Sequence, residues 1–259
     1  MTADPASDPV LGFYGSLADD YRLIFPDWEA SVRRQAEVID RLLRELGVSP
    51  GGSVLDCAAG IGTQSLGLAE RGYRVTATDL TAALLEKLRQ EASRRKLDIP
   101  ARQADLRALD AAVRDRFDAV IAMDNVLPHL PGEEDLTRAA AQMLARLRPG
   151  GAFITSVRDY DQLKAQRPRF DRAMVSPDGR RVAFQVWDWA EDGSRYALKQ
   201  FVLQERDGRW ETHCHPGEYR AVGREELERS LRAAGLADVR WRPPETTGFF
   251  QPILTGRAP

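Results

Sequence analysis

The sequence has little of what secreted or metal-binding proteins contain. It has only two cysteines, Cys57 and Cys214, which lie far apart and in no metal-like spacing, so it indicates neither a disulfide framework nor a metal site. We expect Cys57, at the end of an apolar strand, to pack as a small hydrophobic residue. Few cysteines are typical of a reducing compartment, so we expect a cytoplasmic location.

Long apolar runs and an excess of charge are missing as well. No window approaches the roughly 18 apolar residues of a membrane-spanning helix. The first residues, MTADPASDPV, lack the basic and apolar parts of a secretory signal. The 37 basic residues nearly cancel the 39 acidic ones, so no global basic surface for nucleic acid is indicated. We expect a soluble globular protein without a nucleic-acid or membrane partner, and we leave its oligomeric state open.

What the sequence does contain is an alternation of apolar strands and amphipathic helices between residues 53 and 160. Residues 1 to about 10 are expected to be a disordered tail, and 11–47 to form a helical segment. The alternation predicts a parallel sheet with helices on both faces. After Tyr160 three alternating runs are separated by EDGS and RDGR, which predict hairpin turns. We therefore expect a β-rich insertion over residues 161–215 and a return to the core over 216–259.

The stretch VLDCAAGIGTQS predicts a strand followed by a glycine turn that holds a nucleotide-like ligand. Gly60 and Gly62 allow close backbone approach, and the helix after them directs free N–H groups at a ligand. Asp79, at the end of the next strand, can accept hydrogen bonds from a ribose diol. From these residues alone the ligand could be NAD, FAD or S-adenosylmethionine.

Three features favour S-adenosylmethionine. Ser65 stands where the dinucleotide fingerprint has its third glycine or alanine. Asp56 precedes the turn, where a carboxylate would repel a pyrophosphate but suit a cationic sulfonium. Asp105 follows the third strand, placed for an adenine amino group. If these acids only end strands and cap helices, this interpretation fails.

As a set, VLDCAAGIGTQS, VTATDL, QADLRAL, FDAVIAMDNVLPHL and LRPGGAFITSVRDYD resemble the ordered motifs of class I S-adenosylmethionine-dependent methyltransferases. The resemblance implies an α/β, Rossmann-like fold. Its seven-stranded, mostly parallel sheet has the last strand antiparallel, with a helical N-terminal lid and an inserted antiparallel β-meander. One departure is Ala58, where many members have the first glycine. The residues implied for the cofactor are Tyr21, Arg34, Asp56, Ala58, Gly60, Gly62, Asp79, Leu80, Asp105, Leu106, Met123 and Asn125.

DNVLPHLP, VRDYD and the N-terminal YGSLADDYRLIFPDWEASVRRQ are similar to segments of glycine and glycine/sarcosine N-methyltransferases. This resemblance implies that Arg158 holds the acceptor's carboxylate, with Tyr160 in the same pocket. Without it, a surface salt bridge from Arg158 to a neighbouring aspartate explains that arginine equally well. Arg34, or Arg33 beside it, would grip the donor's carboxylate. The residues expected around the acceptor are Tyr14, Asn125, His129, Arg158, Tyr160, Tyr219 and Arg220.

Catalysis itself needs few dedicated groups, because the donor is already activated; His129 and Tyr21 are the candidates. The histidines of ETHCHPGEYR, His213 and His215, share a strand face without an evident fourth ligand, so we expect no metal. Trp187 and Trp189 share a face too, as packing residues or as a wall of the pocket. We expect methylation of an amine nitrogen of an amino acid or related carboxylate. The alternatives are an O-, C- or ring-N-methyltransferase, a non-catalytic S-adenosylmethionine-binding protein, and a nicotinamide-dependent reductase, which Ser65 disfavours.

Overall fold

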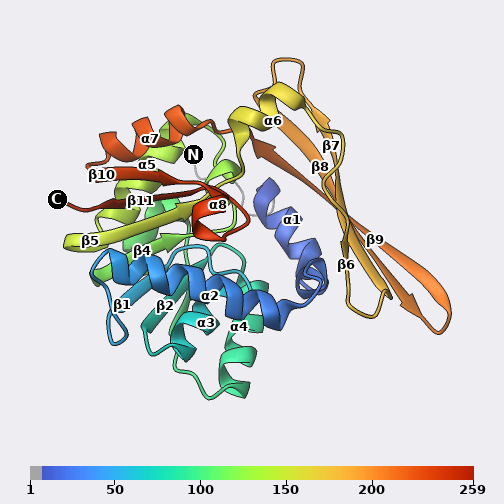
Figure 1. Cartoon of the computed structure of the whole chain (residues 1–259), viewed down its shortest axis with the longest axis horizontal. Coiled ribbons are helices and arrows are strands. Elements are labelled where there is room, and N and C mark those ends of the chain that lie inside the picture. The colour runs from blue at the N-terminus through green and yellow to red at the C-terminus, as the bar shows by residue number, and fades with distance from the viewer. Residues whose placement is uncertain (1–7) are drawn as a thin grey trace. The chain divides into compact units, whose positions relative to one another are not determined.

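A computed structural model describes residues 8–259 of the chain (Figure 1). The described chain divides into two compact units. The core unit comprises Val32–Tyr160 and Val222–Pro259, and the sheet unit comprises Asp161–Ala221 with the N-terminal segment up to Ser31. Each unit has its own sheet, so each is described by itself.

The core unit contains a seven-stranded sheet in the order β10-β11-β5-β4-β1-β2-β3. All of its pairs are parallel except those of β11, which runs antiparallel to both β5 and β10. This confirms the expected sheet with an antiparallel last strand. The strands are β1 Ser53–Asp56, β2 Arg74–Asp79, β3 Ala101–Gln103, β4 Phe117–Ala122, β5 Leu147–Ser156, β10 Ala237–Arg242 and β11 Ile253–Arg257.

Helices cover both faces of this sheet, with α2, α3 and α4 on one side and α5 and α7 on the other (Figure 1). The backbones of α2 and α3 approach closely at Gly67, where an added Cβ would lie 2.5 Å from the Cβ of Ala36. Glycine is needed there because any side chain would push the two helices apart. The bounds are α2 Trp28–Glu45, α3 Thr63–Glu70, α4 Ala82–Arg94, η3 Leu106–Ala111, η4 Leu127–His129, α5 Glu133–Leu144, α7 Arg224–Ala233 and α8 Pro244–Thr247.

The sheet unit is a four-stranded antiparallel sheet in the order β6-β7-β8-β9. Asp207 (φ 50°) and Gly208 (φ 74°) form the two-residue turn between β8 and β9, both in the left-handed conformation that Asp-Gly favours. This confirms the hairpin signal of RDGR. Its elements are α1 Pro9–Leu17, η2 Tyr21–Ile24, α6 Tyr160–Gln166, β6 Met174–Val175, β7 Arg181–Trp189, β8 Arg195–Arg206 and β9 Arg209–Arg220.

Several boundaries differ from the predictions. Residues 1–7 of the expected disordered tail lie outside the described residues, but α1 begins at Pro9, where the Asp8 carboxylate caps the helix. The insertion extends to Ala221 rather than residue 215, because β9 continues to Arg220. The helical pattern after Phe13 is broken between α1 and α2, and α6 and α8 were not predicted. Between residues 8 and 259, no helix is long and apolar enough to cross a membrane.

Candidate functional site

The glycine turn after β1 is tied to the end of β2 by Asp79. Its two carboxylate oxygens accept hydrogen bonds from the Gly60 N–H (2.8 Å) and the Thr81 N–H (2.8 Å). Gly60 (φ 54°) and Gly62 (φ 91°) both take the left-handed conformation that the sequence suggested. Burial raises the pKa of Asp79, although these backbone N–H groups act in the opposite direction. The Asp79 carboxylate retains lone pairs that can accept hydrogen bonds from ligand hydroxyls, as the predicted ribose contact requires.

Asp56, the last residue of β1, is fully buried. Its Oδ2 accepts a hydrogen bond from the Ser65 hydroxyl (2.7 Å), whereas its Oδ1 has no hydrogen-bond partner. Burial raises the pKa of Asp56 to about 7, and the carboxylates of Asp79 and Asp124 add to the rise. Ser65, which sequence reasoning used only to disfavour a dinucleotide, therefore holds this carboxylate in place.

Asp124 brings a third acid to the same edge of the sheet, two residues after the end of β4. Its Oδ2 accepts a hydrogen bond from the Gln64 amide (2.8 Å), and that amide also donates to Gln35 on α2 (2.7 Å). Sequence reasoning missed Asp124, Gln64 and Gln35. The usable signal was Gln35 itself, a polar residue within the apolar stripe of α2.

Asp105 lies at the carboxyl end of β3 but is already engaged. Arg107 donates to it from its backbone N–H (2.8 Å) and its guanidinium (2.6 Å). Burial raises the pKa of Asp105, but the stronger combined effect of Arg107 lowers it below the usual range. Next to it, Leu106 is buried. If an adenine amino group donates to Asp105, the carboxylate therefore accepts hydrogen bonds from that group and from Arg107.

The turns after β4 and β5 are joined by Asn125. Its amide nitrogen donates to the Tyr160 hydroxyl (2.8 Å), and its amide oxygen accepts from the Arg158 backbone N–H (3.0 Å). Three of the predicted acceptor residues are thereby brought together. The Asp159 carboxylate, one candidate partner of Arg158, accepts from Arg224 (2.6 Å).

The remaining predicted residues of the core unit are distributed as follows. Met123 is buried beside this turn, and His129 is partly exposed at the end of η4. Leu80 is partly exposed after β2, and Ala58 belongs to the glycine turn. Arg34 is exposed on α2, as is Arg33. No contact in the structure tests their roles, so these stay predictions.

The sheet unit holds the other predicted residues. The rings of Tyr14 and Tyr21 lie 5.9 Å apart although the helix between them is broken. Tyr219 stacks on Tyr196 (5.7 Å), and Arg220 is partly exposed at the end of β9. Their roles also stay predictions.

His213 and His215 share a face of β9, as expected, and both contact one carboxylate. The Asp20 carboxylate lies within hydrogen-bond distance of His213 Nδ1 (2.6 Å) and His215 Nε2 (3.0 Å), and His215 Nδ1 lies 3.1 Å from the Ser16 hydroxyl. Within residues 8–259, no three acidic, histidine or cysteine side chains are arranged to hold a metal ion. Trp187 is buried and contacts Tyr196 (5.0 Å), as does Trp189 (4.7 Å), so both tryptophans pack within the sheet unit.

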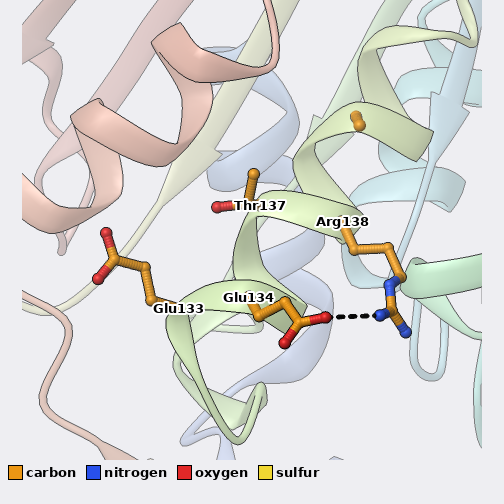
Figure 2. A pocket seen from close by; sticks show the side chains of 5 residues that line it. Glu133, Glu134, Thr137 and Arg138 are labelled. Carbon is orange, nitrogen blue, oxygen red and sulfur yellow. Dashed lines mark hydrogen bonds and ion pairs between the residues drawn. The ribbon is translucent and has the colours of Figure 1, made fainter.

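A surface hollow on α5 is a poor candidate for ligand binding. Figure 2 shows that Glu133, Glu134, Thr137 and Arg138 all come from this one helix, with Glu134 paired to Arg138. Side chains of a single helix do not converge on a ligand as those at the ends of neighbouring strands do.

Comparison with known proteins shows what the part of the chain that forms this edge of the sheet resembles. Residues 54–151, which include the glycine turn and all three acids, match the model of a methyltransferase domain. Over those residues the chain is similar to class I S-adenosylmethionine-dependent methyltransferases. A glycine/sarcosine N-methyltransferase of Parasynechococcus marenigrum is 36% identical over 137 residues, which are 53% of this chain and 48% of the relative. The glycine N-methyltransferase of Rattus norvegicus is 32% identical over 161 residues, 58% and 54% of the two chains.

The chain spans about half the length of the curated relatives that it matches. Similarity to solved structures extends further. The CcbJ methyltransferase from Streptomyces caelestis has a TM-score of 0.76 at 22% identity, covering 95% of this chain and 98% of that one. An S-adenosylmethionine-dependent methyltransferase from Clostridium acetobutylicum has a TM-score of 0.74 at 16% identity, covering 94% and 97%. At these identities the structures show a shared fold.

The residues at this edge fit the donor of the class. S-adenosylmethionine carries a cationic sulfonium and an α-ammonium group, and the edge presents Asp56, Asp79 and Asp124. Within residues 8–259, no lysine or arginine forms an ion pair with Asp56 or Asp124, and each has a buried oxygen without a partner. A cationic ligand would satisfy those oxygens, whereas a pyrophosphate would be repelled.

Proposed function

We propose that this protein transfers a methyl group from S-adenosylmethionine to an amine nitrogen of a small molecule that carries a carboxylate, such as an amino acid. The observation that carries the proposal is the match to glycine and glycine/sarcosine N-methyltransferases, which are 32–36% identical to this chain over 52–58% of its length. The proposal that the acceptor is the amine of an amino acid rests on those relatives and on Arg158.

Arg158 supports a carboxylate acceptor by its place. It follows β5 by two residues, at the edge where open α/β sheets bind ligands. The hydrogen bond from its backbone to Asn125 fixes the base of the side chain. A guanidinium held there offers two parallel N–H donors to a carboxylate, which orients the attached amine as well as binding it.

The donor supplies a methyl group that is already activated by the sulfonium. The protein's remaining tasks are to hold the acceptor nitrogen in line with the methyl carbon, to exclude water and to leave the nitrogen lone pair free. Arg158 and Tyr160 are assigned the first task. His129 is assigned the third, accepting a proton from the acceptor's ammonium group. A Tyr21 contact with the methyl group is the remaining assignment.

The test is a turnover assay with methyl-labelled S-adenosylmethionine and a panel of acceptors. The panel contains glycine, sarcosine, larger amino acids, and for each a matching amine without the carboxylate. We expect label in N-methyl products of the carboxylate-bearing members. Transfer only to hydroxyl, carbon or ring-nitrogen acceptors would reject the amine, and donor binding without any turnover would reject catalysis.

Substitution of Arg158 tests how the acceptor is held. Arg158→Ala is expected to raise the acceptor KM roughly 10- to 100-fold, because a charged hydrogen-bonded pair is lost. The acceptor KM of Arg158→Lys should lie between those of the unmodified protein and Arg158→Ala, since an ammonium group offers a charge but not two parallel N–H donors. Arg240→Ala, an exposed arginine of β10, serves as the control. An unchanged acceptor KM in Arg158→Ala would remove the carboxylate contact from the proposal.

A further inference from the structure

Asp124 has a backbone conformation that its side chain does not favour. Its φ is 58° and that of Asn125 is 67°, so two successive residues with side chains occupy the left-handed region. Glycine is the usual residue for this conformation; aspartate and asparagine tolerate it better than other side chains. Such strain persists where surrounding contacts determine it, and it concentrates at functional sites.

The surroundings do determine this turn. The Asp124 N–H donates to the Ser156 hydroxyl (2.9 Å), and the Asn125 N–H donates to the Ser156 carbonyl oxygen (3.0 Å). The Ser156 hydroxyl in turn donates to Gln251 (3.0 Å). With the backbone fixed from β5, the direction in which the Asp124 carboxylate leaves the chain is fixed as well.

The carboxylate is held on one side only. Oδ2 accepts the hydrogen bond from Gln64, while Oδ1 is buried and has no partner in the described chain. Gln64 and Gln35 are themselves buried, so the contact is built into the packing of α2 against α3. Burial raises the pKa of Asp124 to about 6 against the effect of the Gln64 and Gln35 side chains. Among residues 8–259, no basic side chain pairs with this carboxylate.

Asp124 is also close to the other donor-edge acid. It follows β4, which pairs directly with β1, and its carboxylate contributes to the raised pKa of Asp56. Neighbouring strands thus present two carboxylates, each with one unsatisfied buried oxygen, at the edge where the donor is expected. Of the donor's two cationic centres, only the α-ammonium group has N–H donors that could satisfy such an oxygen.

We propose that Asp124 determines recognition of the methyl donor by binding its α-ammonium group through Oδ1, with Gln64 and Gln35 as positioning residues. The inference rests on the proposed use of S-adenosylmethionine, and it holds whichever acceptor is methylated. It assigns the left-handed turn a purpose, because this conformation directs the carboxylate toward the donor edge.

The test is calorimetric binding with three compounds that separate the donor's charges. S-adenosylmethionine has sulfonium and ammonium, S-adenosylhomocysteine has the ammonium alone, and 5′-methylthioadenosine has neither. In Asp124→Asn we expect the affinity for the first two to fall roughly 10- to 100-fold, as for loss of a charged hydrogen bond. The affinity for 5′-methylthioadenosine should stay within about twofold.

Two further variants separate the carboxylate from the backbone. Asp124→Gly relieves the left-handed strain and removes the carboxylate, and should lose as much S-adenosylhomocysteine affinity as Asp124→Asn. Asp238→Asn is the matched control, an exposed aspartate whose φ is also left-handed at 51°. It should bind all three compounds like the unmodified protein.

Four outcomes would overturn the inference. Equal weakening of all three compounds would make Asp124 structural, and weakening of S-adenosylmethionine alone would place it at the sulfonium. Full affinity in Asp124→Asn or in Asp124→Gly would remove the carboxylate from donor recognition. If the unmodified protein itself bound no S-adenosylhomocysteine, the proposed donor would fail and this inference with it.

Discussion

Each unit of the molecule contains a buried aspartate, Asp20 or Asp56, and the two differ in their hydrogen-bond partners. In the sheet unit, Asp20 is contacted by two imidazoles, those of His213 and His215. In the core unit, Asp56 is contacted by one hydroxyl, and its other oxygen has no partner. A buried acid with its hydrogen bonds made supports the fold, whereas a buried acid without them costs stability. The difference teaches that burial alone does not decide how an aspartate is compensated: Asp20 has two imidazole partners, whereas Asp56 has one oxygen without a partner among the described residues.

The sharpest way to break this comparison is to neutralise Asp56. Its raised pKa means that the folded protein binds a proton more tightly than the unfolded chain, so stability falls as pH rises from about 4 to about 7. Asp56→Asn should remove this slope and raise the free energy of unfolding at pH 8 by roughly 2–4 kcal/mol. Urea unfolding at pH 5 and pH 8 measures both effects.

If the donor binds at this edge as proposed, the same variant should also lose donor affinity, because a negative charge that would attract the cationic donor is gone. Stability and function would then change in opposite directions at one residue. If Asp56→Asn were less stable than the parent at pH 8, with the pH slope retained, the view of Asp56 as an uncompensated acid would be wrong.

Neutralising Asp20 should lower the free energy of unfolding, whereas neutralising Asp56 should raise it. Asp20→Asn keeps the shape but replaces the carboxylate that both imidazoles contact with a neutral amide, which is a weaker acceptor, and we expect a loss of about 1–3 kcal/mol. Hydrogen exchange should rise in α1, η2 and β9 while the core sheet is unchanged. Donor affinity should fall much less than in Asp56→Asn, since Asp20 is not among the residues assigned to the donor. A higher free energy of unfolding in Asp20→Asn than in the parent would mean that Asp20, like Asp56, is an uncompensated buried acid.

The smallest effect separates the two histidines. The His215 side chain is 10% exposed and that of His213 is 47% exposed. His215→Ala should therefore cost about 1–2 kcal/mol through lost packing and hydrogen bonds, and His213→Ala less than about 0.5 kcal/mol. Thermal unfolding of the two variants side by side makes the comparison. Equal losses would show that exposure does not govern this cluster.

Sequence patterns predicted most of the fold, because strand, helix and turn signals are local. The inner parts of β4 and β5, AVIA and AFI, are apolar, and the Asp-Gly turn of RDGR needs only its own two residues to adopt left-handed conformations. The prediction ended the insertion at residue 215, before Pro216 and Gly217, which usually interrupt a strand, whereas β9 continues through both to Arg220.

The candidate site was predicted less evenly. Gly60, Gly62 and Asp79 lie in one motif whose spacing is set by a single β-α-β unit, so the sequence was enough. Asp124 was not found, because its contacts come from Gln64, 60 residues away, and, through it, from Gln35 on α2. No local pattern signals a carboxylate whose partner is chosen by the packing of two helices.

The sequence by itself determined the order of strands and helices, the glycine turn and the kind of charge at its edge, since hydrophobic periodicity, backbone freedom and side-chain type are properties of short segments. Only the tertiary structure decided which acids are compensated. Asp20, Asp56, Asp79, Asp105 and Asp124 are the same residue type in the sequence. Burial and neighbours brought from distant segments give Asp105 an arginine and Asp20 two imidazoles, and leave Asp56 and Asp124 each with one oxygen free.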